Sequence, residues 1–188
     1  MNGLTYLPLF ISEQEEIELV QDIFESPWSL DLKRRTQHYG YKYDYTKKRI
    51  GQDLYLGPIP KWLEVITARV ADIGNYDRIP DQVIVNEYLP GQGIAPHIDC
   101  QPCFGETVSS LSLLSSVRMN FYKRDDPYAE DQSIMLEPKS LLILTGEARN
   151  AWTHSIDRLR YDIINSTTVE RSRRISLTFR TVNSSHIV

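Results

Sequence analysis

The chain has 188 residues, of which 41% are hydrophobic and 24% are charged, and its formal net charge is -4. This length suits one domain with a core of its own, and the composition excludes a disordered or fibrous chain. The negative net charge excludes a protein that is basic over its whole surface, so any contact with nucleic acid must come from a local patch.

Targeting signals and cysteines predict the compartment. No stretch is long enough to span a bilayer, and residues 1–10 lack the basic start and the long apolar run of an export signal. We therefore expect an intracellular, cytoplasmic protein without membrane contact, with a nuclear location left open. Cys100 and Cys103 form a lone C-x-x-C pair without a thioredoxin-like context, and one pair cannot close a four-ligand zinc site. In this setting we expect two thiols that are prone to oxidation, and not a dedicated redox pair.

The first half of the chain contains two predicted helices. Ser12 and Glu15 form a capping box, apolar residues follow at helical spacing, and Pro27 is a stop, so the first helix is expected over residues 13–26. Pro60 suits the first turn of a second amphipathic helix, which ends at Gly74.

Between these helices, residues 28–49 interleave basic and aromatic side chains. Cations suit phosphates and exposed rings stack on bases, which favours a nucleic-acid surface. The period-two spacing of Tyr39, Tyr41 and Tyr43 is equally typical of the buried face of a strand.

From residue 82 onward the pattern predicts mostly strands, at 82–88, 108–114, 117–123, 133–136, 140–146, 152–156 and 174–182. Residues 158–173 look like a long polar insertion before the last strand. Many short strands after two helices predict an α+β, mostly β fold: an antiparallel sandwich with the helices outside.

Three residues are candidate metal ligands. His97 and Asp99 lie two apart in an extended segment and can face one ion, and His154 follows another strand-like run. Two histidines and one carboxylate are the ligands of non-haem Fe(II) oxygenases, although a His-x-Asp pair alone is a weak signal.

The last strand alternates strictly. Arg174, Ser176, Thr178 and Arg180 share one face, which is either a solvated basic face or the wall of a cavity. In a cavity, the two guanidinium groups would suit a dianionic ligand.

Together these segments resemble the AlkB family of Fe(II)- and 2-oxoglutarate-dependent dioxygenases over residues 33–182. The matching motifs, in family order, are Asn86-x-Tyr88-x-Pro90-Gly91-x-Gly93-Ile94-x-x-His97-x-Asp99, Ser110-Leu111-Ser112-Leu113, Ser140-Leu141-Leu142, Thr145-Gly146-Glu147-Ala148-Arg149, Trp152-Thr153-His154, and Arg174 with Arg180. Gln37-His38-Tyr39-Gly40-Tyr41-x-Tyr43 is similar to a subgroup that includes a tRNA wobble-uridine hydroxylase.

The resemblance implies a double-stranded β-helix, or jelly roll. It implies one domain over residues 1–188, with the jelly-roll core at 82–182 and a nucleotide-recognition lid at 28–49. Fe(II) would be held by His97, Asp99 and His154, with 2-oxoglutarate and O2 as co-substrates. The expected 2-oxoglutarate contacts are Asn86, Tyr88, Arg174 and Ser176, with Arg180 fixing Asp99. The expected substrate contacts are Arg35, Tyr39, Tyr41 and Tyr43.

The function implied is oxidative demethylation of N-alkylated bases in DNA or RNA, by a monomer. One alternative is stable hydroxylation of a modified tRNA base, a protein side chain or a small molecule. Another is a non-catalytic nucleic-acid-binding module, which would have no use for Arg174, Asn86 and Tyr88 together. Leu114, Asn150 and Ser155 depart from the family pattern near the mouth of the site and leave the substrate open.

Overall fold

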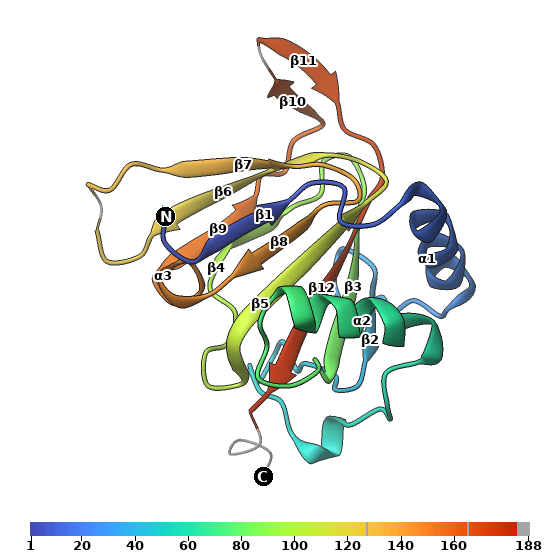
Figure 1. Ribbon diagram of the computed structural model, residues 1–188. Coiled ribbons are helices and arrows are strands. Elements are labelled where there is room, and N and C mark those ends of the chain that lie inside the picture. Colours follow the sequence, from blue (N-terminus) through green and yellow to red (C-terminus); the bar gives the residue numbers. More distant parts are fainter. Residues whose placement is uncertain (127, 165, 184–188) are drawn as a thin grey trace.

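Two antiparallel sheets face each other in the computed structural model, which describes residues 1–126, 128–164 and 166–183 (Figure 1). The larger sheet has the order β1-β8-β5-β12-β3-β2, formed by Leu4–Leu7, Leu141–Leu144, Phe104–Leu113, Arg174–Val182, Gln82–Tyr88 and Thr36–Tyr39. The smaller sheet has the order β4-β9-β6-β7, formed by Ile94–His97, Trp152–Ile156, Val117–Lys123 and Gln132–Leu136. This is the jelly roll that the resemblance implied.

Helices α1 and α2 lie on one outer face of the larger sheet, as predicted (Figure 1). Helix α1 spans Glu13–Glu25, and both halves of its capping box form: the Glu15 backbone N–H donates to Ser12 Oγ at 3.2 Å, and the Ser12 backbone N–H donates to Glu15 Oε2 at 2.8 Å. Helix α2 spans Lys61–Ile73, with Pro60 as its N-cap. The short helix α3 spans Gly146–Asn150, and the 3-10 turn η1 spans Gln52–Leu54. None of the described helices is long and apolar enough to cross a membrane.

The larger sheet separates two cores because its side chains alternate. In β12, Ile175, Leu177 and Phe179 pack with α1 and α2, while the even-numbered residues face the space between the sheets. Strand β8 divides in the same way: Leu141 and Ile143 join the helix-facing core, and Leu142 and Leu144 join the core between the sheets. The wall of the site and the core are therefore the two faces of the same strands.

Three features differ from the expected elements. Strand β1 pairs with β8 from outside the 82–182 segment, and the expected strand from 108 begins at Phe104. The supposed polar insertion contains a two-stranded hairpin, β10 (Tyr161–Ile164) and β11 (Thr167–Glu170). Residues 127, 165 and 184–188 of the expected domain lie outside the described residues.

The β12 alternation predicts a large effect of one core truncation. Leu177→Ala should lower the free energy of unfolding by about 2 to 5 kcal/mol, because Leu177 is fully buried between the sheet and the helices. Denaturant unfolding measures this loss. Val65→Ala is the control, because Val65 on α2 is 76% exposed and its truncation should change stability by less than about 0.5 kcal/mol.

Candidate active site

A cavity of about 490 Å³ opens between the two sheets. The larger sheet contributes Asn86, Tyr88, Arg174, Ser176 and Arg180 to its wall, and the smaller sheet contributes His97 and His154. The even-numbered face of β12 therefore lines a cavity, and the solvated-face interpretation is wrong.

The three candidate metal ligands meet in this cavity. Antiparallel pairing of β4 with β9 sets His97 opposite His154, with ring centroids 4.3 Å apart, and Asp99 follows two residues after β4. One ligand atom from each residue lies within 4.8 Å of the others. This donor set fits Fe(II), and it occupies one side of an ion so that other positions stay open.

Both histidines are prepared for ligation. His97 Nδ1 donates to the Ala95 carbonyl at 2.9 Å, which leaves the lone pair of Nε2 free for a metal. Burial, with the neighbouring His97 ring, lowers the pKa of His154 to about 4. His154 is therefore neutral at pH 7, as a metal ligand must be.

Asp99 is held by Arg180, as the resemblance implied. Arg180 Nη2 donates to Asp99 Oδ1 at 2.9 Å, and Arg180 Nη1 donates to Gln82 Oε1 at 3.1 Å. Burial by itself would raise the pKa of the Asp99 carboxyl, but the cationic groups around it, Arg180 first among them, together outweigh burial and hold that pKa well below its usual range. Asp99 is therefore an oriented carboxylate.

Arg174 has N–H groups that are available to bind a ligand. Its side chain is buried, Nη2 donates to Ser112 Oγ at 2.8 Å, and neither Nε nor Nη1 has a partner among the described residues. Burial lowers its pKa to about 10, so it remains charged at pH 7. Buried N–H groups without partners are rare, and two on one guanidinium fit a carboxylate. Arg174 therefore suits the far carboxylate of 2-oxoglutarate.

The other expected 2-oxoglutarate contacts lie around Arg174. The Tyr88 ring lies under its guanidinium, 5.5 Å away, and Ser176 pairs with Asn86 across strands β12 and β3. Asn86 Oδ1 already accepts from Arg34 Nε at 2.9 Å. The Asn86 amide N–H2 group is thus the part that can donate to a ligand.

Of the four expected substrate contacts, the structure places only Tyr43 in the cavity wall. Arg35 forms a 2.6 Å ion pair with the buried Glu87. Tyr39 packs edge-on against Trp62 of α2, with centroids 5.4 Å apart, and Tyr41 packs against Tyr55 at 4.9 Å. The buried-face interpretation describes Tyr39, which contacts the helix-facing core.

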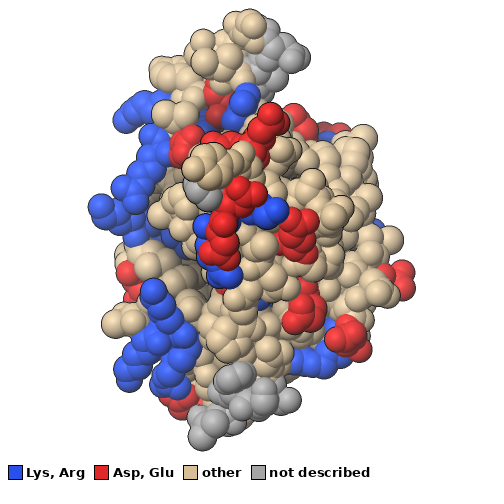
Figure 2. All heavy atoms as spheres, turned by 90° about the vertical axis from the view of Figure 1, so that its left-hand side faces the viewer, with Lys and Arg blue, Asp and Glu red and all other residues tan. Residues whose placement is uncertain are grey.

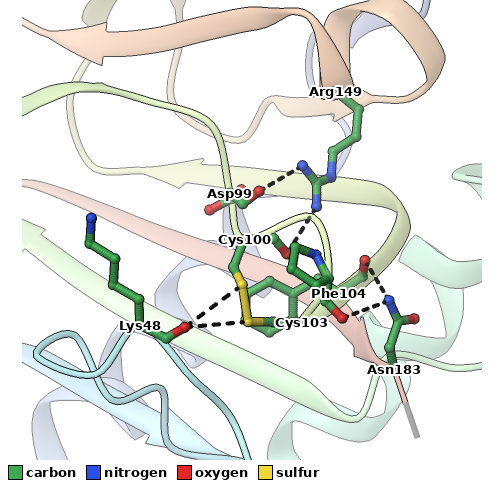
Figure 3. Close-up of a disulfide and its surroundings, with 8 residues drawn as sticks. Lys48, Asp99, Cys100, Cys103, Phe104, Arg149 and Asn183 are labelled. Atoms are coloured by element: carbon green, nitrogen blue, oxygen red, sulfur yellow. Dashed lines mark hydrogen bonds between the residues drawn. A yellow bond between two sulfur atoms is a disulfide. The ribbon is translucent and has the colours of Figure 1, made fainter. Parts of the chain in front are cut away.

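Three further residues of the 28–49 segment line the cavity although they were not among the four expected substrate contacts: Arg34, Tyr45 and Lys48. Their only signal was the basic and aromatic composition of residues 28–49. Arg149 also had no assigned role. It is buried and donates through Nη1 to the Asp99 carbonyl at 2.9 Å, which holds the backbone of the proposed ligand (Figure 3).

Cys100 and Cys103, expected as two thiols prone to oxidation, are joined in a disulfide (Figure 3). The Cys103 backbone N–H donates to the Cys100 carbonyl at 3.2 Å, and this turn brings the two Cα atoms to 5.2 Å, within reach of a disulfide. The disulfide lies next to Asp99, and the Lys48 carbonyl of the 28–49 segment is 3.8 Å from Cys103 Sγ. It therefore closes a short turn between the metal ligands and the mouth.

Loss of any one ligand should prevent assembly of the metal site. The protein with Fe(II) and 2-oxoglutarate in the absence of oxygen should show the weak visible charge-transfer band of a chelated keto acid. His97→Ala, Asp99→Ala and His154→Ala should each abolish the band, because two ligands are too few to anchor the ion. Ser110→Ala, a change elsewhere in the cavity wall, should retain it. A band that survives in all three ligand variants would place the metal elsewhere.

Arg174 should determine affinity for 2-oxoglutarate. Arg174→Ala should weaken binding by about 2 to 5 kcal/mol, because a carboxylate loses its partner in a buried site. Arg174→Lys should lose less, since it keeps the charge but not the planar fork. Titration of the charge-transfer band measures both values. Metal binding without 2-oxoglutarate is the control and should be unchanged, whereas an unaltered 2-oxoglutarate affinity would contradict the assignment.

Comparison with known proteins identifies the family. Residues 3–180 match the model of the 2OG-Fe(II) oxygenase superfamily. The chain is 32% identical over 204 residues to "Probable RNA/DNA demethylase ALKBH6" of Danio rerio, covering 94% of this chain and 84% of the relative. It is 34% identical over 203 residues to "Alkylated DNA repair protein ALKBH8 homolog" of Arabidopsis thaliana, covering 97% of this chain but only 59% of that relative.

A solved structure, "The structure of OsALKBH1", matches with a TM-score of 0.69 and 19% identity, over 95% of this chain and 96% of that one. At this identity the match supports the fold. The family match and the His97, Asp99 and His154 cluster agree on the cofactors, Fe(II) with 2-oxoglutarate and O2. The chain belongs to the 2OG-Fe(II) oxygenase superfamily and is an AlkB-like dioxygenase.

Proposed function

We propose that this dioxygenase oxidatively demethylates N-alkylated bases in DNA or RNA. The observation that carries the proposal is the mouth of the cavity, where Arg34, Tyr43, Tyr45 and Lys48 lie on the same cavity as the metal ligands. Cationic and aromatic side chains together are what a nucleotide requires, because the cations pair with phosphate and the rings stack on the base. The printed names of the two AlkB-like relatives, a probable RNA/DNA demethylase and an alkylated DNA repair protein, support the same class of substrate.

The cavity suits a base turned out of its stack. Its volume of about 490 Å³ is shared by the co-substrate at Arg174 and the substrate at the mouth. Tyr43 lies with its ring 5.8 Å from Phe104, and the Phe104 ring lies 4.9 Å from the Arg180 guanidinium. A flipped base stacked on Tyr43 would therefore lie at the side of the cavity that holds Asp99.

The protein contributes position and charge to the reaction. His97, Asp99 and His154 would hold Fe(II), and Arg174 with Tyr88 would hold 2-oxoglutarate so that its keto-acid end reaches the metal. When bound, Fe(II) and 2-oxoglutarate would supply the oxidation: 2-oxoglutarate and O2 give succinate, CO2 and one oxygen atom that is inserted into a substrate C–H bond. An N-methyl group becomes N-hydroxymethyl, which releases formaldehyde and leaves the unmodified base.

A turnover screen tests the proposal. Methylated single- and double-stranded DNA and RNA are incubated with Fe(II), 2-oxoglutarate and O2, and formaldehyde, succinate and product mass are followed. We expect formaldehyde and succinate in equal amounts, with Asp99→Ala as the inactive control. A product that gains one oxygen atom without releasing formaldehyde would show that the reaction is stable hydroxylation and not demethylation. No turnover of any nucleic acid would overturn the proposed substrate class.

Two tyrosines of the 28–49 segment should behave oppositely. Tyr43→Ala should weaken oligonucleotide binding by about 1 to 3 kcal/mol, because its ring lines the cavity and would lose a stacked base. Tyr39→Ala should instead lower the free energy of unfolding by about 3 kcal/mol or more, because its ring packs on Trp62. Oligonucleotide affinity and the free energy of unfolding are measured for Tyr43→Ala and for Tyr39→Ala. Normal oligonucleotide binding by folded Tyr43→Ala would remove Tyr43 from the substrate site.

A further inference from the structure

The β10–β11 hairpin has no role in the fold or in the metal site. It projects beyond both sheets at the top of Figure 1, and among the described residues none of its side chains belongs to a hydrophobic core cluster. Tyr161, Ile163 and Val169 are 51%, 63% and 42% exposed. These side chains are accessible to a molecule outside the fold.

The base of this arm is nevertheless rigid. Arg171 donates through Nε and Nη2 to both carboxylate oxygens of Asp162, at 2.6 and 2.7 Å, and through Nη1 to the Asp157 carbonyl at 2.6 Å. Arg171 and Asp162 are both buried, and Arg118 of β6 donates to the Ile163 carbonyl. A buried ion pair adds little net stability, so its contribution here is to fix the position of residues 157–162.

This rigid base lies beside the mouth of the cavity. The Gly91 backbone N–H donates to the Leu159 carbonyl at 3.0 Å, and the Gln92 side chain donates to the Lys33 carbonyl at 3.1 Å. Residues 89–93 therefore connect the base of the hairpin on one side with the start of the basic 28–49 segment on the other. The same loop leads into β4, whose Ile94 lines the cavity.

Two exposed arginines, Arg158 and Arg160, stand on this base, and neither forms an ion pair within the described part of the chain. Figure 2 shows Lys and Arg side chains in two groups along the left margin of that view, the upper group just below the hairpin, with an acidic side chain between the groups. The 28–49 segment adds Lys33, Lys47 and Lys48, which are also exposed. The chain as a whole has a net charge of -4. The gathering of cations on this face therefore results from where the Lys and Arg side chains lie in the structure, and not from the composition.

We propose that Arg158 and Arg160 extend the substrate site into a track for the phosphate backbone of a single-stranded nucleic acid. The strand would cross residues 89–93, from the 28–49 segment to the base of the hairpin, with its target base in the cavity. The exposed Tyr161 ring next to Arg160 adds the aromatic surface that such tracks combine with charge. This inference rests on the proposed function, since it places the flanking nucleotides of the same substrate.

The test is a double charge reversal, Arg158→Glu with Arg160→Glu. Affinity for a fluorescent single-stranded oligonucleotide should fall about 10- to 100-fold, and the slope of log affinity against log salt should become shallower by about 1.4, because two phosphate contacts are lost. Lys61→Glu with Arg124→Glu is the matched control: both residues are exposed, they lie on α2 and after β6, and the change in charge is the same. The control should bind within about twofold of the wild-type protein.

Folding and the metal site are followed separately. The Arg158 and Arg160 variant should keep the thermal unfolding midpoint and the charge-transfer band of the wild-type protein, since both side chains are exposed. Wild-type affinity and salt slope in that variant would overturn the track while leaving the proposed function intact. Equal losses of oligonucleotide affinity in the variant and in the control would show that the effect comes from net charge alone. That result would also overturn the proposed track. A wild-type protein that neither binds nor oxidises any oligonucleotide would overturn the proposed function itself.

Discussion

The ion pair between Arg180 and Asp99 is the interaction on which the site depends. Both side chains are only 10% exposed, so each charge has lost most of its hydration, and pairing the two charges offsets part of that loss. The pair is a device for orientation more than for stability, because it turns one carboxylate towards His97 and His154. Arg149 and the turn closed by the disulfide restrain the backbone of the same residue. Asp99 is thereby fixed by its side chain and its main chain together.

Strand β12 explains why the fold and the site cannot be separated. Its odd-numbered residues complete the core under the helices, and its even-numbered residues carry Arg174 and Arg180 into the cavity. A shift of one residue in the register would bury two guanidinium groups among aliphatic side chains and expose Leu177 and Phe179 to the cavity. The hydrophobic pattern that specifies the strand therefore also specifies which cations reach the metal ligands.

Strict alternation is the reason that this part of the molecule was predictable from the sequence. The last strand and the two helices follow from spacing and capping, which are local properties of the chain. The triad needed the resemblance of the surrounding motifs to the AlkB family, because a His-x-Asp pair alone is a weak signal. The tyrosines of residues 28–49 show the limit of that argument: a period of two says that Tyr39, Tyr41 and Tyr43 share a face but not what that face meets. In the structure the chain leaves the sheet after Tyr39, so Tyr39 meets Trp62 while Tyr43 reaches the cavity.

The disulfide and the hairpin were missed for a different reason. Whether two cysteines pair depends on a turn that the sequence Cys100-Gln101-Pro102-Cys103 permits but does not require. The hairpin depends on Asp162 and Arg171, which are nine residues apart and look like ordinary surface charges until their pairing is seen. Charged residues carry no periodic signal of burial, so a buried ion pair escapes any pattern based on hydrophobicity.

The placement of its charged side chains explains how a chain of net charge -4 can carry exposed cations beside the mouth of the cavity. Asp162 and Glu87 are buried and neutralised by Arg171, Arg35 and Arg173, so these carboxylates contribute little to the field outside. Arg158 and Arg160 have no such partner in the described chain and remain exposed beside the mouth. The net charge includes every charged residue equally, but the field at the mouth comes mainly from the exposed, unpaired charges near it. The arginines that have no partner among the described residues, and not the net charge of the chain, therefore set the local charge beside the mouth.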